Sequence, residues 1–313
     1  MSVIVFVSNL SNEEQQQWLT LLTQYLPDET ILLPEQISSK QALSVELAIV
    51  ANPDPKVLLS YPHLLWMHSL WAGVERLVSE FSHHNIKLVR LTDPQLAQTM
   101  AEACLAWTLY LHRNMPEYAQ QQRDKNWQQL PCALASEVRV SILGAGKLGL
   151  AAIDQLKPLG YQVSCWSKTE KSIANVTSYT GELGLQKLLT KTDILINLLP
   201  LTQQNFKLLN QEKLSLLPKG AKLINFSRGA VLDTVALLAL LKTGHLAHAV
   251  LDVFELEPLP VDSELWHHPH ITILPHISAP THMKTASILV AENIINYRQT
   301  GVIPHSVDFT LGY

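Results

Sequence analysis

The sequence predicts an α/β protein made of two doubly wound domains, each built on a parallel sheet. Short apolar runs alternate with helix-length stretches twice, once up to about residue 92 and again from about residue 138. The second set of runs consists almost entirely of Val, Ile and Leu, which is typical of parallel strands covered by helices on both faces. The 313 residues suffice for two domains, since one domain usually takes about 100 to 200.

The first alternation predicts a small α/β domain. It begins with the run VIVFVSNL, followed by the helix-length segment NEEQQQWLTLLTQYL and then by TILLP, ELAIVAN, LLWMHSL and IKLVRL. The pattern breaks at Thr92, where Asp93 is suited to cap a helix and Pro94 to occupy its first turn. One long helix is predicted after this break, from about residue 96 to residue 122.

The second alternation predicts a larger doubly wound domain. Its apolar runs are VRVSIL, YQVSCWS, DILINLLP, KLINFSRG, HAVLDVFE and HITILPHIS. One more amphipathic helix, KTASILVAENIINYRQ, comes after residue 281, and we expect the tail behind it to return to the first domain. The expected domains are therefore residues 1–95 with 285–313, and residues 96–284.

Composition excludes several classes of protein. Hydrophobic residues make up 47% of the chain and charged residues 16%, which indicates a folded globular protein. A formal net charge of -4 gives no basic surface for nucleic acid. Cys104, Cys132 and Cys165 form no metal-ligating or redox pair, so we expect no metal and a reducing compartment. We see neither a signal peptide nor a membrane span, and we expect a cytoplasmic location without membrane partners.

The segment Gly144-Ala145-Gly146-Lys147-Leu148-Gly149 follows one predicted strand and opens a helix. In that context G-x-G-x-x-G predicts a Rossmann dinucleotide site. The first glycine permits the tight turn, the second lets pyrophosphate approach the backbone, and the third lets the helix pack on the strand. The amino terminus of the helix then stabilises the phosphate charge. Glycines that serve only a turn are the alternative.

The residue type at the end of the next strand indicates which dinucleotide binds. About 20 residues beyond the glycine loop, an NAD enzyme presents Asp or Glu to the ribose hydroxyls. This chain has Ser167 there, followed by Lys168, Thr169 and Lys171. A hydroxyl and an ammonium bind a 2′-phosphate that a carboxylate would repel. We therefore expect NADPH, with NADH possible; a solvated surface lysine is the alternative.

Three further residues follow strands near the carboxyl end of the sequence, and ligands of doubly wound sheets bind at that edge. Arg228 follows KLINF, where a guanidinium can bind a carboxylate through two hydrogen bonds. His276 follows ITILP and is a candidate proton donor. Glu257 is our candidate for the carboxylate that contacts the histidine and stabilises its charged form, with Glu255 as competitor. Asp252 is expected near the nicotinamide.

With these motifs, the sequence resembles the D-isomer-specific 2-hydroxyacid dehydrogenase family, and is most similar to its glyoxylate/hydroxypyruvate reductase A branch. The resemblance covers nearly the whole chain. It implies a Rossmann cofactor domain, a smaller flavodoxin-like substrate domain, and an NAD(P)-dependent enzyme. The segments that carry it are HSLWAGVERL, LVRLTDPQLAQTMAEA, HRNMPEYAQQQ, GAGKLG, CWSKTEKS, INLLP, NFSRGAVL, LDVFELEPLP and LPHISAPT.

The resemblance implies a role for each candidate residue. Arg228 would bind the 2-oxoacid carboxylate and polarise the keto group. His276 would protonate the carbonyl oxygen as hydride arrives, and Glu257 would hold the histidine charged. We expect additional cofactor contacts, and the backbone of one loop in the other domain is implied to bind the substrate carboxylate. The residues concerned are Leu199, Pro200, Phe226 and Asp252 for the cofactor, and Ala72, Gly73 and Val74 for the substrate.

The similarity to this branch suggests reduction of glyoxylate to glycolate and of hydroxypyruvate to D-glycerate. Two segments depart from the family pattern: Trp71, which would either narrow the pocket or pack at its mouth, and Ser278-Ala279-Pro280 beside the nicotinamide. A bulkier 2-hydroxyacid and a dinucleotide-sensing regulator on the same fold are the alternatives. By family similarity, the helix from 96 to 122 makes a homodimer our expectation.

Overall fold

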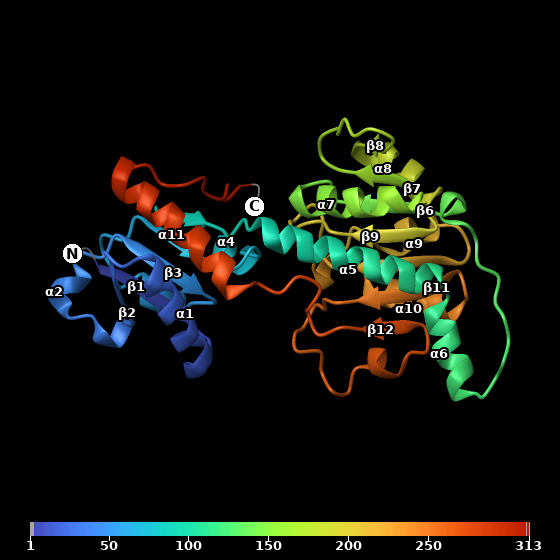
Figure 1. Cartoon of the computed structure of the whole chain (residues 1–313), viewed down its shortest axis with the longest axis horizontal. Helices are drawn as coiled ribbons and strands as arrows, with labels where there is room; N and C mark the ends of the chain where they lie inside the picture. Colours follow the sequence, from blue (N-terminus) through green and yellow to red (C-terminus); the bar gives the residue numbers. More distant parts are fainter. Residues whose placement is uncertain (1–2, 311, 313) are drawn as a thin grey trace. The chain divides into compact units, whose positions relative to one another are not determined.

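The computed structural model describes residues 3–310 and residue 312, and the chain divides into two compact units (Figure 1). One unit comprises the described residues up to Gln95 together with those from Thr281 onward, and the other is Leu96–Pro280. The chain re-enters the first unit at Thr281, whereas the sequence places that boundary after residue 284. Each unit is an α/β structure around a parallel sheet, which confirms the predicted fold class.

The first unit contains a five-stranded parallel sheet in the order β2-β1-β3-β4-β5, which is the flavodoxin-like order. Alternate residues of β1 face opposite sides of the sheet, so Ile4 and Phe6 pack with Trp18 in one core while Val5 and Val7 join a second core. Burial on both faces explains the unbroken apolar strands. The strands are β1 (Val3–Ser8), β2 (Thr30–Leu32), β3 (Leu47–Ala51), β4 (Trp66–Ser69) and β5 (Lys87–Val89).

Helices cover both faces of this sheet. Trp18 and Leu22 of α1 share a core with Val290 and Ile294 of α11, so these helices, far apart in sequence, pack on the same face. The helical segments are α1 (Asn12–Tyr25), η1 (Pro34–Gln36), α2 (Ser39–Ala42), α3 (Pro55–Leu58), α4 (Glu75–Phe81) and α11 (Met283–Thr300).

The second unit contains a seven-stranded parallel sheet in the order β12-β11-β10-β9-β6-β7-β8. The order reverses between β6 and β9, as in dinucleotide-binding folds, and the crevice at such a reversal is where ligands bind. The sequence does not predict β8, a short edge strand of Thr, Ser and Tyr with no apolar run. The strands are β6 (Arg139–Leu143), β7 (Gln162–Trp166), β8 (Thr177–Tyr179), β9 (Ile194–Asn197), β10 (Ala221–Asn225), β11 (Leu246–Leu251) and β12 (Ile271–Ile273).

Helices also cover both faces of the larger sheet, and α5 runs across one of them (Figure 1). Among the described residues, no helix combines the length and the apolar character needed to cross a bilayer. The helical segments are α5 (Pro94–His112), α6 (Met115–Arg123), η2 (Ala135–Glu137), α7 (Lys147–Leu156), η3 (Lys157–Leu159), α8 (Gly181–Leu189), α9 (Gln211–Ser215), η4 (Gly229–Val231), α10 (Thr234–Lys242) and η5 (Glu264–His267).

The single long helix predicted from 96 to 122 is wrong. The segment forms two helices, because Asn114 adopts a left-handed conformation with φ of 54° that interrupts the helical hydrogen bonds. Pro116, which has no N–H, then occupies the first turn of α6, where that group needs no helical partner. The predicted cap at Asp93 is confirmed, since Gln95 N donates to its Oδ1 at 2.8 Å.

Two buried histidines are held neutral by their surroundings. His68 in β4 donates from Nδ1 to the carbonyl of Ser69 at 2.9 Å, so its Nε2 accepts from Asn293 Nδ2, also at 2.9 Å. His248 in β11 lies 2.9 Å from Thr272 Oγ1 through Nε2. Burial lowers the pKa of each ring to about 4.

Stability is therefore expected to fall as the pH drops from about 6.5 towards 4, because only the unfolded chain takes up these protons in that range. Substituting His68→Gln should reduce the loss between pH 6.5 and pH 5 by up to about 2 kcal/mol. Urea unfolding at pH 7, 6 and 5 measures the effect, with His63→Gln at an exposed position as control. An unchanged pH dependence in His68→Gln would contradict the assignment.

Candidate functional site

The glycine loop joins β6 to α7 with the geometry that a pyrophosphate requires. Gly144 has φ of 99°, and a Cβ there would lie 2.8 Å from the carbonyl oxygen of Leu198. A Cβ on Gly149 would overlap the carbonyl of Gly144, so the helix approaches the turn closely. A Cβ on Gly146, in contrast, would meet nothing within 4 Å. The loop is thus compact on its protein side and open at Gly146.

The amino terminus of α7 is suited to an anion. Its N-cap is Gly146, which has no side chain that could cap the helix, and this leaves the first backbone N–H groups of the helix for a ligand. Ala145 is buried, Lys147 is exposed, and Leu148 packs against the core of the unit. The residues present therefore fit a dinucleotide.

The end of β7 presents a cation rather than a carboxylate. Ser167 is 8% exposed, and its hydroxyl donates to the carbonyl of Thr169 at 2.7 Å. Lys168 is exposed on the same turn. Because the hydroxyl hydrogen of Ser167 is engaged within the turn, Lys168 is the group that offers hydrogen-bond donors and positive charge to a phosphate here.

The neighbouring strands β9 and β10 bring the next predicted residues to one edge of the sheet. Leu199 and Pro200 follow β9, while Phe226 and Arg228 follow β10, and the two strands pair in register. Leu199 and Phe226 are buried. Arg228 is half-buried and donates from Nη1 to the carbonyl of Ser227 at 2.7 Å.

The predicted histidine and one of its two candidate carboxylates are in contact. Glu257 Oε2 lies 2.7 Å from His276 Nδ1, and its other oxygen accepts from Phe254 N at 2.9 Å. Glu255 instead lies 3.8 Å from Lys207 Nζ. With Nδ1 bound to the carboxylate, the ring has Nε2 for a substrate. The arrangement resembles an acid–base dyad.

Asp252 supports the segment that carries His276. The residue is 2% exposed, and its carboxylate accepts from Ile277 N at 2.7 Å and from Ser278 N at 2.9 Å, while His276 N donates to the Asp252 carbonyl at 2.9 Å. These bonds hold the backbone on both sides of His276, which has φ of 55°. The acidic side chain is therefore occupied by backbone donors, a use that the sequence did not indicate.

In the first unit, the predicted substrate loop follows β4. Trp71 N donates to Ser69 Oγ at 3.0 Å, and the Trp71 ring meets Trp18 edge-on with centroids 6.1 Å apart. Trp71 thus packs on the core of its own unit. Ala72 and Gly73 are half-buried, whereas Val74 is 5% exposed and precedes α4.

Sequence reasoning missed two buried asparagines, Asn197 and Asn225, at the carboxyl ends of β9 and β10, and the buried Ser227 beside Arg228. Both asparagines are 0% exposed. A polar residue that closes an apolar strand just before a predicted site is the signal that would have found them, in INLLP and INFSRG.

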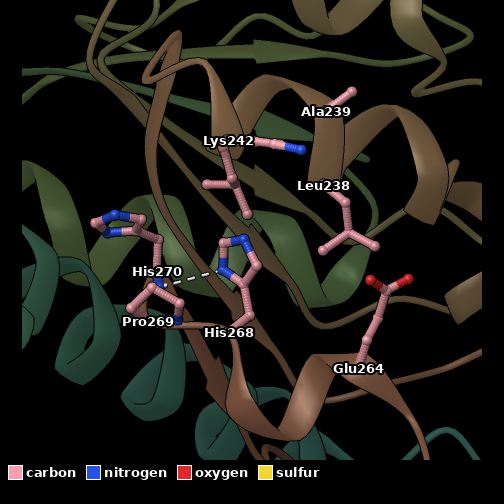
Figure 2. A pocket seen from close by; sticks show the side chains of 8 residues that line it. Leu238, Ala239, Lys242, Glu264, His268, Pro269 and His270 are labelled. Atoms are coloured by element: carbon pink, nitrogen blue, oxygen red, sulfur yellow. Dashed lines mark hydrogen bonds between the residues drawn. The ribbon is translucent and has the colours of Figure 1, made fainter.

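A separate cavity of about 390 Å³ lies beside α10 (Figure 2). It lies by the start of β12, whereas His276 follows the end of that strand. His270 N donates to His268 Nδ1 at 3.2 Å in this cavity. In the described part of the chain, no three His, Cys, Asp or Glu side chains are grouped to hold a metal ion. The cavity is lined by Leu238, Ala239, Leu241, Lys242, Glu264, His268, Pro269 and His270, none of them a predicted site residue.

The fold and the glycine loop define the class of dinucleotide-binding α/β proteins. Within that class, the chain belongs to the D-isomer specific 2-hydroxyacid dehydrogenase family, because the model of that family's NAD binding domain matches residues 105–278. The chain is accordingly an NAD(P)-dependent oxidoreductase, and the predicted family resemblance is confirmed.

Individual relatives agree with this assignment. The chain is 38% identical to glyoxylate/hydroxypyruvate reductase A of Yersinia enterocolitica over 90% of this chain and 91% of that protein. It is 34% identical to the protein of the same name from Serratia proteamaculans, over 99% of both. Among solved structures, it is similar to a D-isomer specific 2-hydroxyacid dehydrogenase from Xanthobacter autotrophicus Py2 in complex with NADPH and MES, with a TM-score of 0.92, 34% identity, and coverage of 100% and 99%.

Proposed function

We propose that this protein uses NADPH to reduce small 2-oxoacids, glyoxylate to glycolate and hydroxypyruvate to D-glycerate. The observation that carries the proposal is the 2.7 Å contact between His276 and Glu257, at the sheet edge where Arg228 also follows a strand. Support comes from the relatives named glyoxylate/hydroxypyruvate reductase A and from the NADPH in the Xanthobacter structure.

The residues proposed to hold the cofactor come from several strand ends of the second unit. The glycine loop and the start of α7 would bind the pyrophosphate, and Lys168 would bind the 2′-phosphate. When bound, NADPH supplies the hydride that adds to C2 of the 2-oxoacid. The proposed cofactor-binding residues are Gly144, Ala145, Gly146, Lys147, Leu148, Gly149, Ser167, Lys168, Leu199, Pro200, Phe226 and Asp252.

The side chains have separate roles in the proposed reaction. Arg228 binds the substrate carboxylate and polarises the keto group, because a guanidinium presents paired donors and a permanent charge. His276 Nε2 gives its proton to the carbonyl oxygen, and Glu257 stabilises the charged ring through Nδ1. The backbone of Ala72, Gly73 and Val74 provides further donors for the substrate.

Steady-state assays of NADPH oxidation with glyoxylate, hydroxypyruvate, pyruvate and 2-ketobutyrate test this function. We expect the first two to give the highest kcat/KM. A preference for 2-ketobutyrate would instead indicate a dehydrogenase for a bulkier 2-hydroxyacid. Dinucleotide binding without turnover of any of the four would favour a regulatory protein on the same fold.

Lys168 is expected to determine the preference for NADPH. Substituting Lys168→Asp should lower the ratio of kcat/KM for NADPH to that for NADH by about tenfold or more, because it replaces attraction of the 2′-phosphate by repulsion. The ratio is measured at saturating glyoxylate, with Lys187→Asp on the outside of α8 as control. A wild-type protein that prefers NADH would contradict the cofactor assignment.

We also propose that the protein is a cytoplasmic homodimer. Family similarity supports the dimer, as do apolar side chains exposed in and after α6, with Met115 at 45% and Trp127 at 98%. Light scattering that gives the 35.0 kDa of one chain would contradict it.

A further inference from the structure

Two buried side-chain amides lie side by side beneath the proposed site. Asn197 ends β9, Asn225 ends β10, and the two residues are paired in register in the sheet. Each is 0% exposed. Asn197 Nδ2 donates to Asn225 Oδ1 at 3.0 Å. Polar groups buried this deeply are costly unless their hydrogen bonds are made, so their remaining partners matter.

Those partners fix the orientation of both amides. Leu199 N can only donate, and it faces Asn197 Oδ1 at 3.3 Å. Ser227 N likewise donates to Asn225 Oδ1 at 3.4 Å, whereas the Arg228 carbonyl accepts from Asn225 Nδ2 at 3.4 Å. Each amide therefore accepts with its oxygen and donates with its nitrogen. Exchanging the oxygen and nitrogen positions of either amide would place donor against donor and acceptor against acceptor.

The same bonds connect two loops that the proposed function uses for different ligands. Asn197 holds the backbone at Leu199, on the proposed cofactor side, while Asn225 holds the carbonyl of Arg228, on the substrate side. Ser227 links the two loops a second time, because its hydroxyl donates to the Leu199 carbonyl at 2.5 Å. The backbone on either side of the crevice is thus joined through three buried side chains.

We propose that Asn197 and Asn225, with Ser227, are positioning residues that fix the backbone of Arg228 relative to the cofactor loop at Leu199. This inference rests on the proposed function, since it assigns Arg228 to the substrate and Leu199 to the cofactor. Asn225 acts on substrate binding and turnover through Arg228, and Asn197 acts on cofactor binding through Leu199. Removing either side-chain amide also weakens the support that the other gives, because the two amides share a hydrogen bond.

The test compares two measurements, the steady-state kinetics with glyoxylate and the Kd for NADPH. Asn225→Ala should raise KM for glyoxylate and lower kcat, reducing kcat/KM by about tenfold to a hundredfold, as a displacement of about 1 Å does. Its Kd for NADPH should change by less than about threefold, whereas Asn197→Ala should weaken that Kd by about tenfold. Ser227→Ala, which removes a single bond, should change kcat/KM in the same direction by less.

A matched control lies at the opposite end of the same sheet. Ser141 and Thr192 are also buried, with hydroxyls 2.6 Å apart, but Thr192 precedes β9 where Asn197 ends it. Thr192→Val should lower Tm while leaving kcat/KM and the Kd for NADPH at wild-type values. If Thr192→Val lowers kcat/KM as Asn225→Ala does, the effect is loss of stability and the inference is wrong.

Amide hydrogen exchange gives a readout that needs no turnover. In the protein without substrate, Asn225→Ala should speed exchange in residues 226–231, and Asn197→Ala in residues 198–201. A wild type that binds NADPH but reduces none of the 2-oxoacids contradicts the proposed function, and exchange then decides the inference alone. An active wild type whose Asn225→Ala variant keeps its KM, kcat and exchange rates overturns the inference and leaves the function standing.

Discussion

Replacing Arg228 by alanine is expected to lower kcat/KM for glyoxylate and hydroxypyruvate by about a thousandfold or more. The substrate carboxylate would lose its paired charge-assisted donors, and the keto group would lose a positive charge where negative charge develops in the reaction. Steady-state rates of NADPH oxidation measure the loss. The Kd for NADPH, followed by fluorescence, should stay within about threefold of wild type, since the cofactor is assigned to other residues.

Two further variants sharpen this prediction. Arg228→Lys retains the charge but has no planar fork, so it should recover only part of the activity. Arg76→Ala is the matched control, because Arg76 is an exposed arginine of the first unit that pairs with Glu80 at 3.5 Å. Turnover like that of the wild type in Arg228→Ala would show that Arg228 has no part in the mechanism.

Replacing His276 by alanine is the second large effect, an expected loss of about a hundredfold to ten-thousandfold in kcat, the usual contribution of a positioned proton donor. NADPH binding should persist. A variant that keeps the kcat of the wild type would show that the proton comes from elsewhere.

The carboxylates near His276 provide an internal comparison. Glu257→Gln keeps the size of the side chain but removes the charge next to Nδ1, so kcat should fall by less than in His276→Ala. Glu255→Gln should have little effect, because Glu255 lies by Lys207 on an exposed surface. Equal losses from the two substitutions would argue against a specific dyad.

Much of the fold follows from simple rules of burial. Strands such as β3, Leu47–Ala51, are buried on both faces, so every residue is apolar and the run is unmistakable. β8 lies at a sheet edge with partly exposed residues and has no such signature. The break between α5 and α6 depends on one left-handed residue, Asn114, inside a pattern that otherwise suits a helix.

The residues of the candidate site likewise include some that the sequence reveals and some that it does not. Residues immediately after strands, such as Arg228 and His276, can be found from sequence because topology brings strand ends to one edge. The sequence favoured Glu257 with Glu255 as competitor, but the two carboxylates are only two residues apart, and it is the folded turn that brings Glu257 to His276. Asn197 and Asn225 were missed because their partners are mostly backbone groups, which a sequence pattern does not reveal.

The position of α11 in the chain determines when the first unit can be completed. Its face of the sheet includes Trp66, whose ring lies 5.2 Å from that of Tyr297 in α11. During synthesis at the ribosome, all of Leu96–Pro280 emerges before this helix does. The later unit can therefore fold first, while the earlier one keeps an apolar surface uncovered until α11 has been synthesised. Nascent chains stopped before Met283 would expose that surface to chaperones.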